Sequence, residues 1–330
     1  MSSISKINLF FKPNSVQQKA SKIADIVLEQ RRPMKGEIFT QEDFLYLKNR
    51  VAKQVTLFIE KSEKIPIVLV GFSMKSPSPL KTISQNADRA EYEAIKHLDN
   101  LTKKIKDVYS TGSDFKIYAD GRIFVDTIVG SSDERVTQYV QGLRKFLKLQ
   151  KTQDIEIISP EDFTPNKKVN SARNFLFSEF PVKKEELHQL IEKDYFLQQY
   201  KRFMRDFYAK DIRAQFPKMS IKQSKKVGAE VALGVISAAE SLDRYVKSIY
   251  GDAMLRVSVH AKPVHDLYNK IGIFLNSAQS NCPMPWHGAA IKTAQNNSED
   301  IFTYEKKCKL EKMGAHLIPD LDGKGAYYSF

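Results

Sequence analysis

Arg256, Ser258 and His260 occupy alternate positions of one apolar stretch, MLRVSVH, and together they could bind an anion and move a proton. In a β-strand, alternate side chains point to the same face. Arginine binds phosphate or carboxylate through paired hydrogen bonds, and histidine titrates close to neutral pH. These residue types suit a polar cleft better than a hydrophobic core, so we interpret them as one wall of a site.

Trp286, the only tryptophan of the chain, lies next to His287 in the stretch PMPWHG. A single tryptophan usually fills a hydrophobic core. Between Pro285 and Gly288, however, the pair could equally form an aromatic wall beside an acid–base group. The sequence leaves both interpretations open.

Asp120, Gly121 and Arg122, followed by Asp126, lie where one extended segment gives way to the next. Asp-Gly is a turn signal, and a β-hairpin is the simplest interpretation. Alternatively, Arg122 just beyond a strand end could bind a phosphate or a carboxylate through both guanidinium nitrogens. Both interpretations again stay open.

Lys75, Ser76 and Lys81 follow the apolar run 65–70, in a loop that contains two prolines. A run that is apolar at nearly every position is typical of a strand covered on both faces. In an open α/β sheet, ligands bind just beyond the carboxyl ends of the strands. The loop is therefore a candidate anion site, with an ordinary surface loop as the alternative.

Several familiar site patterns are missing from the sequence. No GxGxxG, P-loop or GxSxG lies in a strand–turn–helix context, which disfavours a nicotinamide enzyme, an ATPase and a serine hydrolase. The spacing of His260, His265 and His287 matches no zinc or facial-triad pattern, so we predict no metal site.

The composition is that of an ordinary globular protein with a basic surface. The 330 residues carry a net charge of +13, but the lysines are spread along the chain rather than clustered. Nucleic-acid binding is therefore the weaker alternative to an enzyme. Two cysteines without CxxC spacing predict no disulfide framework. We expect no signal peptide, no membrane span and a cytoplasmic location.

Hydrophobic periodicity predicts alternating strands and helices. We expect helices at about 16–29, from Thr40 onward with a capping box to Asp43, and at 88–109, 132–149 and 221–250. We expect strands at 65–70, 115–120, 123–129, 155–159, 254–260, 270–275 and 287–292. The pattern indicates an α/β fold, a Rossmann-like three-layer sheet with helices on both faces. One domain would span 1–330, with a helical N-terminal segment at about 1–64 and a helical insertion at about 166–222.

Four segments in this order resemble the pyoverdine/dityrosine biosynthesis family: MKSPSPLKT, YADGRIFVD, RVSVHAKP with KIGI, and MPWHG. This family includes bacterial isocyanide (isonitrile) synthases and the yeast spore-wall dityrosine enzyme. The resemblance runs from about residue 65 to residue 292. One departure concerns the third segment, where family members often continue with His-Pro and this chain has His260-Ala261-Lys262-Pro263.

The resemblance implies an enzyme that converts the amino group of tyrosine or tryptophan to an isocyanide, with ribulose 5-phosphate as the carbon donor. It implies no metal or organic cofactor, and an oxygenase that acts later in the same pathway. The candidates for acid–base catalysis are His260, His287, Asp120 and Asp126. The candidates for substrate binding are Lys75, Ser76, Lys81, Arg122, Arg256, Ser258, Phe72 and Trp286. A related enzyme that produces formyl-tyrosine is the alternative.

Overall fold

A parallel five-stranded sheet forms the middle layer of the protein in a computed structural model, which describes residues 15–163, 169–266, 268–276, 282, 284–296 and 299–330. The strand order is β3-β2-β1-β4-β5, and every neighbouring pair is parallel. The strands are β1 (Ile65–Gly71), β2 (Ser113–Ala119), β3 (Ile155–Ile158), β4 (Leu255–Ser258) and β5 (Ile271–Gly272). The chain adds strands on one side of β1 first and on the other side later, so β1 and β4 flank a topological switch point.

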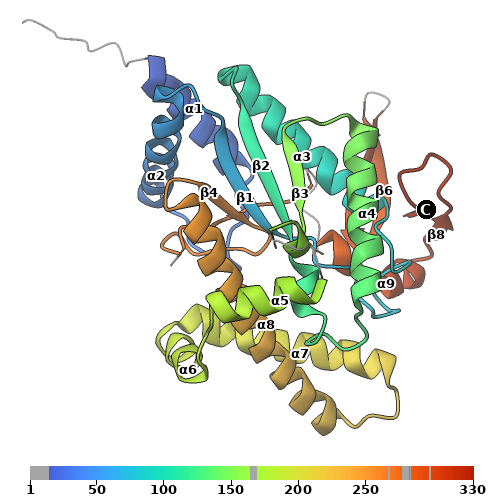
Figure 1. Cartoon of the computed structure of the whole chain (residues 1–330). Helices are drawn as coiled ribbons and strands as arrows, with labels where there is room; N and C mark the ends of the chain where they lie inside the picture. Colours follow the sequence, from blue (N-terminus) through green and yellow to red (C-terminus); the bar gives the residue numbers. More distant parts are fainter. Residues whose placement is uncertain (1–14, 164–168, 267, 277–281, 283, 297–298) are drawn as a thin grey trace, which may run out of the picture.

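Helices cover both faces of this sheet (Figure 1). One layer consists of α1 (Ser15–Glu29), α2 (Gln41–Glu60), α3 (Arg89–Val108) and α4 (Asp133–Gln150). The other region contains α5 (Val169–Glu179), α6 (Lys184–Lys193), α7 (Tyr195–Gln215) and α8 (Ile221–Tyr250). The predicted α/β architecture is therefore confirmed.

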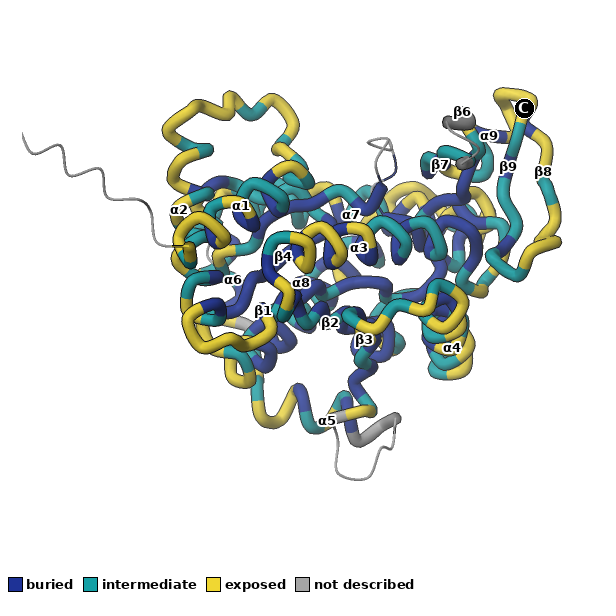
Figure 2. The backbone as a smooth tube through the Cα atoms, turned by 90° about the horizontal axis from the view of Figure 1, so that it is seen from above, coloured by how far each residue is buried: buried dark blue, intermediate teal, exposed yellow. Residues whose placement is uncertain are grey.

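The alternation of side chains along β1 explains why this strand is apolar at nearly every position. Ile65, Ile67 and Leu69 pack into the core formed with α1 to α4. Val68, which points the other way, packs into a second core with residues of α7 and α8. Seen from above, the central strands β1 and β4 are largely buried and the outer surfaces of α2 and α4 are exposed (Figure 2). A strand with two buried faces needs apolar residues on both.

Local capping sets several helix starts. Thr40 and Asp43 form the predicted capping box at the start of α2. Asp88 forms a second box with Glu91 at the start of α3, and α8 begins at a third box after Ser220. Such boxes satisfy backbone N–H groups that have no partner within the helix.

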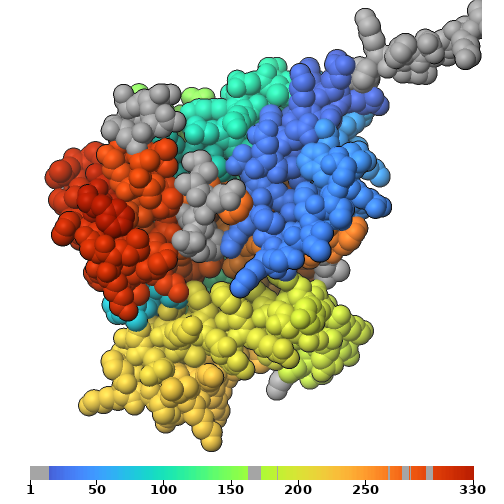
Figure 3. Space-filling model, turned by 180° about the vertical axis from the view of Figure 1, so that it is seen from behind, coloured from blue at the N-terminus to red at the C-terminus, as the bar shows by residue number. Residues whose placement is uncertain are grey.

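The helical segment predicted in the middle of the chain lies below the carboxyl ends of the strands in Figure 1. From the opposite side, its yellow helices form the base of the molecule, beneath the blue N-terminal and red C-terminal segments (Figure 3). Its helix α7 packs closely along α8, the helix that follows. A Cβ at Gly228 of α8 would lie only 2.5 Å from the carbonyl oxygen of Arg205, so a residue without a side chain is needed at this contact. We propose that this segment and the sheet form one domain.

The strand predicted at 123–129 is wrong. Residues Asp120–Phe124 form a short 3₁₀-helix, η1, and the hairpin interpretation of Asp120-Gly121 fails with it. A Cβ at Gly121 would lie 1.6 Å from the carbonyl oxygen of Ser73. Glycine is needed here because the chain after β2 folds back against the segment that follows β1, and not because a hairpin turns.

The strand predicted at 287–292 also lies elsewhere than expected. It belongs to β6 (Ala289–Asn296), which pairs in a separate four-stranded sheet of order β7-β6-β9-β8. The remaining elements of this C-terminal region are β7 (Glu299–Glu305), α9 (Lys307–Lys312), β8 (His316–Ile318) and β9 (Tyr327–Ser329). A short 3₁₀-helix, η3 (Pro285–His287), leads into β6. Within the described ranges, no helix is long and apolar enough to cross a membrane.

Lys75 links three segments: the loop after β1, the start of α3 and the residues around η3. Its buried ammonium lies 3.0 Å from Asp88 and 2.8 Å from Glu91, at the start of α3. It also donates hydrogen bonds to the carbonyl oxygens of Pro285, at 3.0 Å, and Gly288, at 3.2 Å. Four acceptors around one buried cation fix the loop after β1 against α3 and η3.

Lys75→Met should destabilise the fold by about 3–5 kcal/mol, because removing one partner of a buried ion pair leaves the other without compensation. Urea unfolding at neutral pH measures this loss. Lys104→Met is the control, since the Lys104 side chain of α3 is 54% exposed and its partner Glu29, at 3.7 Å, is 60% exposed. We expect it to cost under about 1 kcal/mol. Equal effects of the two substitutions would contradict the structural role of Lys75.

Candidate active site

A cavity of about 210 Å³ opens at the carboxyl ends of β1 and β4. Ser73 follows β1, Arg256 and Ser258 belong to β4, and α7 and α8 supply the opposite walls. The volume is many times the roughly 10–15 Å³ that one water molecule needs, so a small organic molecule can enter. The cavity lies at the switch point of the sheet, where α/β proteins bind their ligands.

Charged groups gather where β4 meets α8. Arg256 donates to the Asp243 carboxylate at 2.5 Å, and the ammonium of Lys270 binds the same carboxylate. Burial opposes ionisation of Asp243, but the cations Lys270 and Arg256 outweigh it and lower the pKa of this carboxyl. Two cations share one carboxylate, so the group keeps an excess positive charge.

The Arg256 guanidinium also has unused donors. Its Nε and Nη1 atoms are buried and have no hydrogen-bond partner among the residues that the structure describes. An unpaired buried donor is costly, and a ligand oxygen would satisfy it. Arg256 can therefore bind an anion at this end of the cavity.

Both histidines at the cavity are neutral at physiological pH. Burial, with the nearby cation Lys262, lowers the pKa of His260 to about 3. Burial and Lys81 hold the pKa of His287 well below its ordinary value. The ring of His260 lies 5.4 Å from that of Tyr200, and the His287 ring lies 4.9 Å from that of Phe207. Each ring is therefore neutral near pH 7 and can accept a hydrogen bond, but with so low a pKa neither ring is a strong base.

Asp120 has the opposite behaviour. Burial raises the pKa of its carboxyl to about 7, although the Ser73 hydroxyl opposes this by donating a hydrogen bond at 2.5 Å. Near neutral pH this carboxyl therefore holds a proton part of the time. The carboxyl of Asp120 thus has a higher pKa than the imidazole of His260, the reverse of their ordinary order. Titratable groups whose pKa values are shifted in this way often act as proton carriers in enzymes.

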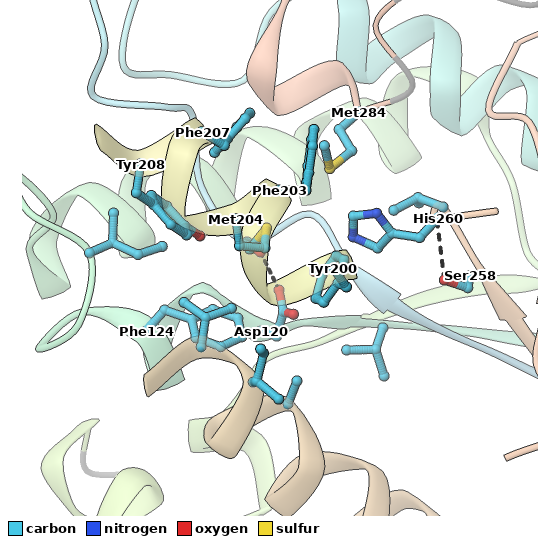
Figure 4. Close-up of a pocket in the computed structure, with 18 of the residues that line it drawn as sticks. Asp120, Phe124, Tyr200, Phe203, Met204, Phe207, Tyr208, Ser258, His260 and Met284 are labelled. Carbon is cyan, nitrogen blue, oxygen red and sulfur yellow. Dashed lines mark hydrogen bonds between the residues drawn. The ribbon is translucent and has the colours of Figure 1, made fainter. Parts of the chain in front are cut away.

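The remaining wall is aromatic and apolar. One face of α7 lines it with Tyr200, Phe203, Met204, Phe207 and Tyr208, which are labelled in Figure 4. Trp286 and Met284 close the wall from η3 and the residue before it. Such a surface suits an apolar or aromatic side chain of a ligand.

Seven of the residues predicted for the site line this cavity. They are Ser76, Asp120, Arg256, Ser258, His260, Trp286 and His287. The predicted common face of Arg256, Ser258 and His260 is thus real, and the four resembling segments include residues that meet at one cavity.

Three predicted anion-binding cations lie outside the cavity lining. Lys75 is held by the buried carboxylates of α3, as described above. Arg122 is buried between Asp133, at 3.2 Å, and Glu161, at 3.0 Å. Lys81 pairs with Asp211 at 2.6 Å. Each cation is paired with protein carboxylates and does not line the cavity, so its role as a substrate contact stays a prediction that this arrangement does not favour.

Two further predicted residues also lie outside the lining. Asp126 has a side chain that is 75% exposed and pairs with Arg173 at 3.1 Å on the surface, so it does not share the environment of the proton carriers. Phe72 is fully buried, with its ring 5.1 Å from that of Trp286. It supports the tryptophan from behind and does not form the wall itself.

Sequence reasoning missed the residues that come from the helical middle and from the segment after β4. The aromatic residues of α7 recur every three or four positions, a spacing that places them on one helix face. That signal was present in the sequence. Asp243 gave no comparable signal, because only the fold brings α8 beside β4 and β5. Lys262 and Lys270 lie in the resembling segments RVSVHAKP and KIGI but were not predicted as site residues.

Comparison with known proteins decides the family. A model of the pyoverdine/dityrosine biosynthesis protein family matches residues 55–318, more than half of the chain. The chain belongs to this family. The crystal structure of the PvcA protein from Pseudomonas aeruginosa has the same fold, with a TM-score of 0.85 and 22% identity over 94% of this chain and 99% of that one.

Curated members of this family carry related names. The chain is 26% identical to the L-tryptophan isonitrile synthase AmbI1 of Fischerella ambigua (strain UTEX 1903) over 268 residues, 80% of each protein. It is 35% identical to the isocyanide synthase xanB of Aspergillus fumigatus over 88 residues, which are 26% of this chain and 11% of that protein. These likenesses support an enzyme of the isocyanide synthase kind.

Asp120→Asn should make the protein more stable at alkaline pH. The folded-state pKa of Asp120, about 7, lies above its ordinary value of 3.8, so the stability that the protonated carboxyl contributes is complete below pH 3.8 and is lost as the pH rises through 7. Asparagine does not titrate. At about 1.36 kcal/mol per pKa unit, the variant should gain roughly 1–4 kcal/mol over the wild type between pH 4 and pH 8. Urea unfolding at the two pH values measures the gain, and a difference that does not change with pH would contradict it.

Proposed function

We propose that this protein is an isocyanide synthase that converts the amino group of an aromatic L-amino acid, tyrosine or tryptophan, into an isocyanide, with ribulose 5-phosphate as the carbon donor. The observation that carries the proposal is one cavity with two walls: buried Arg256, whose Nε and Nη1 have no partner among the described residues, lies in one, and an aromatic surface from α7 and Trp286 forms the other. Family membership and the names of the relatives support the same chemistry.

The two walls suit the two substrates. Arg256 and Lys270 share the Asp243 carboxylate, and the unpaired Nε and Nη1 donors of Arg256 can form two hydrogen bonds to a phosphate. The face of α7 and Trp286 can hold an aromatic ring through edge and stacked contacts. Between these walls the amine of the amino acid would meet the ketone of the sugar phosphate.

The titratable groups suit the first step, in which amine and ketone join and lose water. The amine must be neutral to attack. The neutral imidazoles of His260 and His287 can accept a hydrogen bond from it, whereas Asp120, with a pKa of about 7, is the stronger base for its proton. The ketone oxygen must leave as water, and Asp120 can supply a proton to it near neutral pH. The later carbon–carbon cleavage would use the same groups again. The proposal includes neither a metal nor an organic cofactor, and it assigns the use of the product to an oxygenase of the same pathway.

The proposed reaction is tested by incubating the protein with tyrosine, tryptophan and ribulose 5-phosphate labelled with carbon-13. We expect an isocyanide that carries the label and forms only when the sugar phosphate is present. The alternative, suggested by the dityrosine branch of the family, is an enzyme that produces formyl-tyrosine. Mass spectrometry distinguishes the two products, because the mass of a formamide exceeds that of the corresponding isocyanide by one water. Rapid sampling separates direct formation of the formamide from hydrolysis. No labelled product from either amino acid would refute the proposal.

Arg256→Ala should raise the KM for ribulose 5-phosphate roughly 10- to 100-fold, since a hydrogen bond to a charged group contributes about 1.5–3 kcal/mol. The KM for the amino acid should change far less. Arg244→Ala is the matched control, because Arg244 extends from the same helix as Asp243 but pairs with Glu186 and Glu240 and does not line the cavity. Steady-state kinetics with each substrate varied in turn measures both constants. Equal effects on the two KM values would contradict the assignment of Arg256 to phosphate binding.

A further inference from the structure

Two lysines line the cavity in the described part of the chain, and their ammonium groups are held differently. The Nζ atom of Lys270 binds the Asp243 carboxylate directly. The Nζ atom of Lys262 lies 3.7 Å from the nearest oxygen of Asp266, beyond hydrogen-bond distance, and 5.0 Å from the centre of the Phe196 ring. The Lys262 side chain is 14% exposed, so this amine is sheltered, and its ion pair with Asp266 is longer than the direct contact of Lys270 with Asp243.

The surroundings of Lys262 favour its neutral form. Burial and the cation Lys270 lower the pKa of Lys262 to about 8, although Asp266 and Asp243 act in the opposite direction. At pH 7 roughly a tenth of such amines is unprotonated, whereas an ordinary lysine with a pKa near 10.4 is almost wholly charged. A neutral, buried lysine amine is a recognised nucleophile toward carbonyl carbons.

The position of Lys262 relative to the anion site is also suitable. Lys262 interacts electrostatically with Lys270 and Asp243, and Asp243 holds Arg256. A phosphate bound by Arg256 would therefore lie near the Lys262 amine, and the carbonyl of a short sugar phosphate would extend into the same part of the cavity. The neutral imidazole of His260, two residues before Lys262, lines the cavity as well.

We propose that Lys262 is a covalent catalyst that forms an imine with the ketone carbon of the sugar phosphate, before the amino acid takes its place. This inference rests on the proposed function. The Nζ lone pair bonds to the carbonyl carbon. The carbonyl oxygen takes one proton from this nitrogen and one from Asp120 and leaves as water, and a protonated imine remains. The amino-acid amine then adds to the same carbon, and the Lys262 amine departs. One water is released in all, and nothing is oxidised or reduced.

Trapping with sodium borohydride tests this step. The full-length protein is incubated with ribulose 5-phosphate alone and then reduced, which converts an imine to a stable secondary amine. We expect the protein to gain the mass of the sugar phosphate less one oxygen atom, on the peptide that contains Lys262. Tyrosine or tryptophan added before the borohydride should discharge the adduct, because its amine displaces the lysine.

Two conservative variants provide the controls. Lys262→Arg keeps the positive charge but is not nucleophilic, so it should lose the adduct and lower kcat by on the order of 10²-fold or more, with little change in the KM for the sugar phosphate. Lys270→Arg keeps the contact to Asp243 and should still form the adduct on Lys262. A loss in kcat with little change in KM indicates an amine that reacts, whereas a rise in KM alone indicates an amine that only binds phosphate.

The outcomes distinguish the two proposals. If isocyanide forms but no adduct is trapped on Lys262, the covalent role is overturned and the proposed function stands. If the adduct appears on Lys262 but no isocyanide forms from either amino acid, the lysine role stands and the proposed function fails. An adduct on Lys270 alone would also overturn the assignment to Lys262.

Discussion

The arrangement of the site depends on the buried ammonium of Lys75. It bridges Asp88 and Glu91 at the start of α3 and the carbonyl oxygens of Pro285 and Gly288 around η3. A charge in a region without water is stable only when its partners surround it closely, so the positions of these three segments become mutually dependent. The backbone N–H of Ser76, the next residue, also donates to the carbonyl oxygen of Trp286 at 2.8 Å. The side chains of η3 are thereby placed beside the end of β1.

The second consequence of burial is chemical. Removal from water disfavours the charged form of every ionisable group, which raises the pKa of an acid and lowers that of a base. Burial raises the pKa of Asp120 to about 7 and lowers that of His260 to about 3, so the carboxyl becomes the weaker acid of the two. A carboxyl that holds a proton and an imidazole that lacks one then coexist at neutral pH. The helices α7 and α8, which close the cavity, therefore help to create the acid–base chemistry as well as the shape.

The buried cations divide into two groups according to their partners. Lys75, Lys81 and Arg122 are each matched by carboxylates of the protein and stabilise the fold. Arg256 shares its carboxylate with Lys270 and keeps unpaired donors. The overall charge of +13 does not distinguish these groups. Only the balance of partners around each cation shows which of them can bind a substrate anion.

The sequence alone determined the alternation of strands and helices, the capping box at Thr40, the span of α8 and the shared face of Arg256, Ser258 and His260. These features depend on residues that are close in the chain, where periodicity and capping act directly. The resemblance of four ordered segments to one family was visible at the same level, as was the shared α7 face of the aromatic residues.

The tertiary structure decided which charged residues face the cavity. Arg122 and Lys75 look like anion ligands in the sequence, but carboxylates distant in the chain neutralise them. Asp243 looks ordinary, yet the packing of α8 against the carboxyl edge of the sheet brings it beside Arg256 at the site. The physical reason is that burial and charge pairing arise between segments far apart in sequence. The availability of a buried charge is therefore a property of the folded chain and not of its local pattern.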